Sequence, residues 1–275
     1  MIRFYFTFLS LLTCLFVQSQ GWQPAGSRSM SMANSTVALA DVWSYHHNPA
    51  GLAFVKKTAA GLSYENRFLL KELQTQALVV AQPLKVGVLS AGAQMYGHRA
   101  YKTTRVGLGY SMLLGENISA GVQLNYQGIR IDQYGSKGTV TAEAGFLAKI
   151  NSKVSLGFSV MNLGMAKLTE FEDDRFSTFM RLGLNYQISK KVIILAEVDK
   201  SIETKLRAKA GMEYELLDRF FLRMGVASNP TEITFGFGYE FKNRLKLDLG
   251  SAWHQHLGWS PHFGLTYEFL NKKHD

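Results

Sequence analysis

The chain has 275 residues, of which 47% are hydrophobic and 12% aromatic, and its formal net charge is +9 at pH 7. Cys14 is its only cysteine, which excludes a disulfide within the chain, a cysteine-based metal site and a catalytic thiol in the mature protein. After the first twenty residues no stretch reaches about 18 uninterrupted apolar residues, which excludes a bundle of membrane-spanning helices. The Lys and Arg residues are scattered, so nucleic acid is not an expected partner.

The first 19 residues have the features of an export signal. Arg3 supplies a positive start, and residues 4–17 are almost wholly apolar. Val17-Gln18-Ser19 offers a site for signal peptidase, so we expect the mature chain to begin after Ser19. A lipoprotein signal ending at Cys14 is the alternative, but Thr13 is a poor residue before a lipidated cysteine.

The stretch between the export signal and the first strand does not alternate between apolar and polar residues. Ser35 or Thr36 could cap a short helix over residues 37–45, and Asn48-Pro49 would end it, because the residue before a proline avoids the helical region. Gly51 would then permit a tight turn into the first strand. The stretch is too short and too polar for a separate domain, so we expect it to fill the lumen of a barrel.

From Lys57 onward the sequence alternates between apolar and polar residues in runs of about ten, which is typical of transmembrane barrel strands. In residues 232–241, Ile233, Phe235, Phe237, Tyr239 and Phe241 share one face, and Glu232, Thr234, Gly236, Gly238 and Glu240 share the other. Strands of soluble β-sandwiches also alternate, but they are usually shorter than the nine or ten residues that a tilted crossing of a membrane needs.

Periodicity and turn residues together predict an all-β fold: a transmembrane antiparallel β-barrel of about 14 strands. The predicted strands are 58–66, 73–82, 86–96, 103–113, 117–130, 138–149, 154–163, 177–188, 192–200, 205–216, 220–227, 231–241, 244–254 and 260–269. Tight turns occupy every second connection, and longer loops lie between them, the longest at residues 164–176. This alternation of short periplasmic turns and longer outer loops supports an even strand number.

A finer repeat combines a glycine with a tyrosine three positions later. It occurs at Gly61–Tyr64, Gly107–Tyr110, Gly183–Tyr186, Gly211–Tyr214, Gly236–Tyr239 and Gly264–Tyr267. Tyrosines at matching strand ends would form an interfacial girdle. The glycines would face the lumen and leave room for a segment lying against the wall.

The last predicted strand resembles the assembly signal of outer-membrane barrels. The residues that carry this resemblance are His262, Gly264, Tyr267 and Phe269. Two features weaken it: residues 270–275 follow the final aromatic residue, and Thr234, Gly236, Tyr239 and Phe241 satisfy the same pattern.

The N-terminal stretch resembles the opening of the FadL/PorV superfamily of outer-membrane proteins over residues 25–53. The plug motif that carries the resemblance comprises Asp41, Asn48, Pro49, Ala50, Gly51 and Leu52, after a start rich in small residues. The resemblance implies a plug inside a fourteen-stranded barrel. The sequence departs from the family pattern at Met32-Ala33, where glycines are common, and at Val42, where a second acidic residue is usual. The expected organisation is therefore a signal peptide at 1–19, a plug with a short helix at 20–56, a barrel at 57–269 and a tail at 270–275.

The sequence offers no convincing catalytic or metal site. His46-His47 and the pair His254 and His256 lack an evident third ligand, and an acidic cluster in the longest outer loop is better explained as solvated. We therefore expect no enzyme activity, cofactor or metal. Charges expected to face the lumen, as plug anchors or as a filter, are Arg105, Arg181, Arg207, Lys209, Glu213, Lys246 and Asp248.

The resemblance implies two functions of different class in the cell outer membrane. One is a PorV/PorQ-like protein-binding component of the type IX secretion system, with secretion proteins or cargo as partners. The other is a FadL-like channel for uptake of hydrophobic small molecules. Short predicted outer loops favour the first, because FadL-like channels have large outer loops. Outer-membrane lipids are expected partners in either case, and a plug argues against a general porin.

Overall fold

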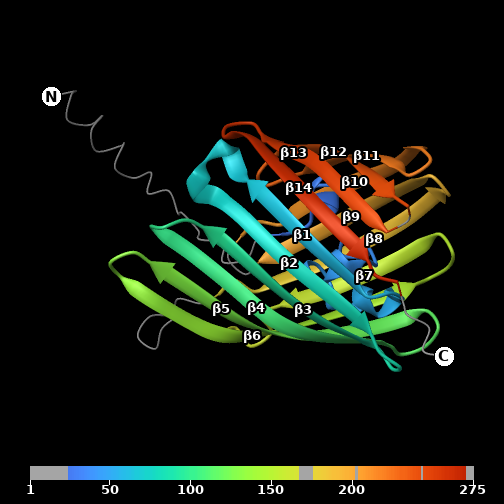
Figure 1. Cartoon of the computed structure of the whole chain (residues 1–275), viewed down its shortest axis with the longest axis horizontal. Helices are drawn as coiled ribbons and strands as arrows, with labels where there is room; N and C mark the ends of the chain where they lie inside the picture. The colour runs from blue at the N-terminus through green and yellow to red at the C-terminus, as the bar shows by residue number, and fades with distance from the viewer. Residues whose placement is uncertain (1–23, 167–175, 202–203, 243, 271–275) are drawn as a thin grey trace.

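The computed structural model describes residues 24–166, 176–201, 204–242 and 244–270, and these form a closed barrel of fourteen antiparallel strands around an N-terminal plug (Figure 1). The expected export signal, its cleavage site and most of the C-terminal tail lie outside the described residues. So does the acidic cluster Glu170, Glu172, Asp173 and Asp174. No helix in the described ranges combines the length and the hydropathy needed to cross a membrane.

Each strand pairs with its neighbours in sequence, and β1 closes the barrel against β14, with Ala59 opposite Glu268. The strands are β1 (Ala59–Asn66), β2 (Gln74–Pro83), β3 (Val88–Gly97), β4 (Tyr101–Leu113), β5 (Ile118–Ile131), β6 (Gly135–Lys149), β7 (Val154–Met161), β8 (Phe179–Ser189), β9 (Val192–Ser201), β10 (Arg207–Leu217), β11 (Phe220–Ala227), β12 (Glu232–Phe241), β13 (Leu245–His254) and β14 (Gly258–Glu268). The predicted strand number is confirmed. The largest shift of a strand boundary is at β6, which begins at 135 rather than 138.

The outer wall is apolar and the inner wall polar, the reverse of a soluble sandwich. On β12, Phe235 is 47% exposed on the outside, whereas its neighbour Thr234 is 2% exposed and points inward. This follows from the two-residue period of strand side chains. The apolar face predicted for residues 232–241 is therefore the surface that would contact lipid.

The two ends of the barrel differ in their connections. At one end, which we call the turn end, lie the short turns such as 114–117 and 190–191, together with the start of β1 and the end of β14. At the other, the loop end, lies among others the β1–β2 connection, with the 3₁₀ helices η3 (Arg67–Leu69) and η4 (Lys71–Leu73). By the usual arrangement of such barrels the turn end is periplasmic.

The tyrosines of the glycine–tyrosine repeat do not all lie at matching ends. Those of β4, β8, β10, β12 and β14 are near the turn end, but Tyr64 is near the loop end, opposite Gln76. The reason is strand direction. β1 runs opposite to the even-numbered strands, so the same offset from a glycine carries its tyrosine toward the other end. The expected girdle is therefore a five-member turn-end group without Tyr64.

The plug has a different local structure from the single helix expected over residues 37–45. It contains the short helix α2 (Ser27–Met30) and the 3₁₀ helices η1 (Val42–His46) and η2 (Pro49–Phe54). Helix η1 begins at Val42 because the Asp41 carboxylate, not Ser35 or Thr36, accepts the cap hydrogen bond from Trp43 N at 2.8 Å. Gly51 lies within η2 and not in a tight turn, since six residues form that helix before β1 begins.

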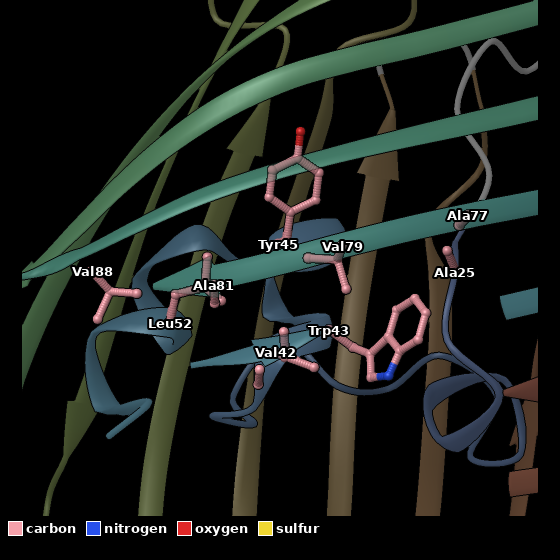
Figure 2. Close-up of a cluster of buried hydrophobic side chains, with 10 residues drawn as sticks. Ala25, Val42, Trp43, Tyr45, Leu52, Ala77, Val79, Ala81 and Val88 are labelled. Carbon is pink, nitrogen blue, oxygen red and sulfur yellow. The ribbon is translucent and has the colours of Figure 1, made fainter. Parts of the chain in front are cut away.

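One side of the plug is held by apolar contacts (Figure 2). Helices η1 and η2 contribute Val42, Trp43, Tyr45 and Leu52, which pack with Ala25 against Ala59, Ala77, Val79, Ala81 and Val88 of β1 to β3. Small and branched apolar residues thus replace polar ones on the inner face of these strands. Burial of this cluster fixes the plug against one sector of the wall.

Candidate functional site in the barrel lumen

Glycines on the inner wall allow the plug backbone to lie directly against the strands. A Cβ atom added at Gly61, Gly183 or Gly264 would come within 2.6–2.8 Å of Trp43, Val37 or Ser27. At Gly157 it would lie 2.2 Å from the carbonyl oxygen of Val37. The room that the repeat was expected to provide is therefore occupied by the plug. Gly107 is the exception within the repeat, because its Cβ would meet Asn125 of the neighbouring strand.

Asp41 and Asn48 of the plug motif act as caps and cross-links. The amide N of Asp41 donates to Ser44 Oγ at 3.2 Å, which completes a capping box, and Asp41 Oδ2 pairs with Arg28 at 2.9 Å. Asn48 caps η2 through Ala50 N, while its Nδ2 donates to Val37 O at 2.7 Å and to Phe146 O at 3.1 Å. One asparagine thus joins two parts of the plug and strand β6.

The remaining motif residues contact the wall or the plug interior. Ser111 Oγ donates to Pro49 O at 2.6 Å, and Ser119 Oγ donates to Ala50 O at 2.9 Å. A Cβ at Gly51 would lie 2.5 Å from Ser44 Oγ, and Leu52 is fully buried. At the two departures from the family pattern, Met32 packs against the glycines of β10 and β11, and Val42 joins the apolar cluster.

Charged side chains hold the plug in the middle of the lumen. Arg181 Nε pairs with Glu197 Oε1 at 2.8 Å, and Arg181 also donates to the backbone oxygens of Asn34 at 2.8 Å and His47 at 3.2 Å. Glu197 Oε2 accepts from Val37 N at 2.9 Å, and Lys209 binds Glu197 at 2.9 Å. Lys209 also pairs with Asp199.

A second group of charges lies nearer the turn end. Arg28 of the plug pairs with Glu213 Oε1 at 2.6 Å, Glu213 pairs with Arg223 at 2.5 Å, and Arg223 pairs with Asp248 at 2.6 Å. Arg28 also contacts Asp41, so this group connects the wall with the cap of η1. Opposite charges in contact are what makes ionised groups tolerable inside a barrel.

The other charges predicted to face the lumen are also paired. Arg105 Nη2 binds Glu143 at 2.5 Å, deep in the wall, and Arg207 binds Glu232 at 2.6 Å near the loop end. Lys246 is 40% exposed and lies 3.4 Å from Glu268 at the turn end. These cations were predicted from the sequence, but the partners Arg28, Glu143, Glu197, Asp199 and Arg223 were not. The partners on the wall could have been predicted, because each lies at a strand position that the two-residue alternation turns toward the lumen.

Burial changes the titration of three plug side chains. It lowers the pKa of His46 and His47 well below 6.5, and the charges of Arg105 and Arg181 lower these values further. Burial also raises the pKa of Tyr45 to about 12, although Arg105 opposes this shift. Both imidazoles are therefore neutral at pH 7, although the hydrogen bond that His47 Nε2 donates to Ala25 O at 2.8 Å acts to raise the pKa of His47.

The predicted histidine pairs are placed far apart. His46 and His47 are buried in the plug, whereas the His254 and His256 rings lie 6.0 Å apart at the loop end. Across the described ranges no group of three His, Cys, Asp or Glu side chains is arranged to hold a metal ion.

The residues of the predicted assembly signal divide between the two faces of β14. His262 Nδ1 lies 2.8 Å from Ser27 Oγ of the plug, and Gly264 lies against the same serine. Tyr267 and Phe269 point outward near the turn end, with ring centroids 4.9 Å apart. A role for them in assembly stays a prediction.

A pocket of about 330 Å³ lies between the plug and the turn end of the wall. Its aromatic lining comes from Trp43, Phe54 and Phe221, and charged residues, among them Arg28, Glu213, Lys56 and Glu240, make up about half of the lining residues. Ala40, an exposed plug residue, also lines it. The volume lies within the range of small-molecule sites. Two much smaller cavities, each about 10 Å³, lie in the loop-end half of the lumen.

These features define a transmembrane β-barrel that is closed by an internal plug. The sequence matches no protein-family profile. It also matches none of the curated proteins.

Solved structures similar to this chain include channels, transporters and a FadL homologue. The CymD monoaromatic hydrocarbon channel has a TM-score of 0.68 at 11% identity, covering 89% of this chain and 97% of CymD. The toluene transporter TbuX of Ralstonia pickettii has a TM-score of 0.68 at 10% identity, covering 92% of this chain and all of TbuX (100%). A Pseudomonas aeruginosa FadL homologue has a TM-score of 0.64 at 13% identity, covering 92% of this chain and 100% of the homologue. At such low identity the likeness shows a shared fold.

Proposed function

We propose that this protein is an outer-membrane channel that admits small hydrophobic molecules, in the manner of FadL-like proteins. The observation that carries the proposal is the turn-end pocket of about 330 Å³, where aromatic side chains of plug and wall meet. The names of the similar barrels, a monoaromatic hydrocarbon channel and a toluene transporter, support the same class of substrate. The apolar outer wall and the periplasmic character of short turns support placement in the outer membrane.

The short outer loops predicted from the sequence favoured a protein-binding role over a channel, and the proposed function is the reverse. A PorV/PorQ-like protein-binding role in type IX secretion remains the second candidate. It is favoured by three short loop-end connections, at residues 98–100, 132–134 and 255–257, each of which offers little surface to capture a hydrophobic molecule. The fold of the similar structures favours the channel over this role.

Filling the pocket tests the proposal. The side chain of Ala40 lines the pocket and is exposed, so Ala40→Trp should occupy its volume without disturbing the buried plug contacts. We expect uptake of radiolabelled toluene, by cells that lack other hydrocarbon channels, to fall by about tenfold relative to wild type. Glu116→Trp, at an exposed turn of the same end, is the matched control and should leave uptake unchanged. Toluene uptake that is no faster with the wild-type barrel than without it would exclude the channel function.

A further inference from the structure

A second cavity, on the outside of the barrel, is not explained by a channel through the lumen. It has a volume of about 370 Å³ and lies at the loop end of β2 to β5, which are neighbouring strands of the wall (Figure 1). Gln74, Lys102 and Arg130 line it, and Lys102 pairs with Arg130 on β5 and with Gly97, another lining residue, on β3. The cavity is therefore built on regular strands.

The cavity lies at the edge of the apolar outer surface of the barrel. On β4 the outward positions change from Val106 through Thr104 to Lys102, and on β5 from Tyr126 through Gly128 to Arg130. On β2 the change is from Leu78 to Gln76 and Gln74. Outward residues that turn from apolar to polar mark the depth at which hydrocarbon gives way to lipid headgroups.

The charge of the cavity is predominantly positive. Arg99, Lys102 and Arg130 are exposed cations in its lining, and Asp132 is the acidic residue there. Within the described part of the chain, no ion pair engages any of these three cations with a carboxylate. Cations that converge without acidic partners at headgroup depth are suited to phosphate groups, whose oxygens accept several charge-assisted hydrogen bonds.

We infer that this cavity binds the phosphorylated headgroup of an outer-leaflet lipid, with Lys102 and Arg130 contacting the phosphate and Gln74 and Gln76 contacting neighbouring polar groups. The inference rests on the proposed outer-membrane placement, with the loop end outward, but not on hydrocarbon transport. Arg130 and Lys102 project from paired strands, so their spacing is set by the barrel. Arg99, on the β3–β4 connection at the loop end, adds a third cation to the lining.

The test uses the full chain folded in detergent, with lipid A carrying two phosphates as the probe and native mass spectrometry as the readout. The site variant is Lys102→Gln with Arg130→Gln, and the control is Lys153→Gln with Lys191→Gln, which removes the same charge from exposed turn-end positions. Heat-modifiable migration on gels verifies that both variants fold. We expect wild type and control to bind the lipid equally, and the site variant to bind about tenfold more weakly.

Two further binding experiments distinguish a lipid phosphate from free inorganic phosphate as the ligand. Lipid A from which both phosphates have been removed should lose the preference for wild type over the site variant. Inorganic phosphate at millimolar concentration should not displace the lipid, because the acyl chains add binding through the apolar wall. The inference would be overturned if the control variant bound lipid A as weakly as the site variant. It would also be overturned if wild type bound the dephosphorylated lipid as tightly as lipid A, or if free phosphate displaced lipid A. None of these outcomes depends on toluene uptake, so the two proposals can fail separately.

Discussion

Single residues in the lumen show how buried charge is made stable. Glu197 has a fully buried carboxylate that accepts from Arg181 and Lys209 and from the plug backbone at Val37. A buried ion pair contributes little net free energy over an apolar pair, but loss of one partner leaves the others unpaired in a medium of low polarity. Such groups therefore fix the position of the plug more than they raise overall stability.

Replacing Glu197 should therefore be costly. We expect Glu197→Gln to lower the free energy of unfolding by about 3–5 kcal/mol, because Arg181 loses its charged acceptor and Lys209 keeps only Asp199. The measurement is urea unfolding of the protein in phospholipid vesicles. Glu268→Gln, which removes the solvent-accessible pairs of Glu268 with Lys57 at 3.5 Å and with Lys246 at 3.4 Å, should change stability by less than about 0.5 kcal/mol. Similar losses in the two variants would contradict this account of the lumen.

The buried histidines predict a dependence of stability on pH. His46 and His47 stay neutral in the folded protein because their pKa values are well below 6.5, whereas the unfolded chain binds protons near that value. Stability is therefore complete above pH 6.5 and falls as the pH drops below it. At pH 5.5 each ring should cost about 1 kcal/mol relative to pH 7.5.

The variant His46→Phe keeps an aromatic ring against Tyr45 but removes one titrating group. We expect its stability to fall less than that of wild type between pH 7.5 and 5.5, again by urea unfolding in vesicles. His256→Phe, at an exposed loop-end position, should keep the wild-type dependence. An unchanged pH dependence in His46→Phe would mean that this ring is protonated in the folded state.

At the scale of elements, the wall and the plug fit because glycines alternate with tightly hydrogen-bonded polar residues on the inner face. Gly157 illustrates this, since a methyl group there would lie 2.2 Å from the Val37 carbonyl oxygen. Backbone atoms of the plug cannot move as a flexible side chain would. The plug must therefore shift if this glycine is replaced.

Gly157→Ala should loosen the plug. Trypsin cleaves after Arg28, which is held in ion pairs by Glu213 and Asp41 in the wild type, so cleavage there reports release of the plug. We expect the variant in vesicles to be cut several times faster than wild type, since overpacking costs about 1–3 kcal/mol. Gly115→Ala, where a methyl group meets open space, should behave as wild type. Unchanged protection of Arg28 in Gly157→Ala would show that the plug does not depend on this close approach.

The assembly signal can be tested by a pair of matched aromatic residues. Phe269 and Phe241 are each 45% exposed, and each makes an edge contact with a tyrosine two positions earlier, at 4.9 Å and 4.6 Å. We expect Phe269→Ala to reduce the folded barrel recovered from outer membranes at least about twofold, and Phe241→Ala to have less effect, because only the last strand would carry the signal. Equal yields would indicate that the aromatic residue acts through the wall alone.

Strands were predictable from the sequence, but the plug was not. Alternation of side chains is a local property, so it places β12 within one residue of its observed bounds. The plug is shaped by distant contacts: Glu197 of β9 accepts from the Val37 amide, and Asn48 donates to the backbone of β6. A helix over residues 37–45 is locally reasonable and is prevented by these partners. The alternation of side chains predicts that the acidic partners of the lumen cations face inward. Which cation each one pairs with depends on the register between strands, which the sequence alone does not give.

For the whole molecule, the central claim is that a plugged barrel serves the passage of hydrophobic molecules. The pocket lies between the plug and the turn end of the wall. The polar lumen, with its paired charges, gives a hydrophobic molecule little surface elsewhere. A bound molecule should therefore be found among Trp43, Phe54 and Phe221.

Native mass spectrometry of the protein, extracted gently from its own outer membrane, tests this claim most directly because it detects bound proteins and small molecules together. The account predicts a barrel without protein partners that carries a hydrophobic small molecule, and loss of that molecule in the Ala40→Trp variant. A barrel that is extracted in complex with secreted or translocon proteins, and that carries no such molecule, would contradict the account and favour the secretion role.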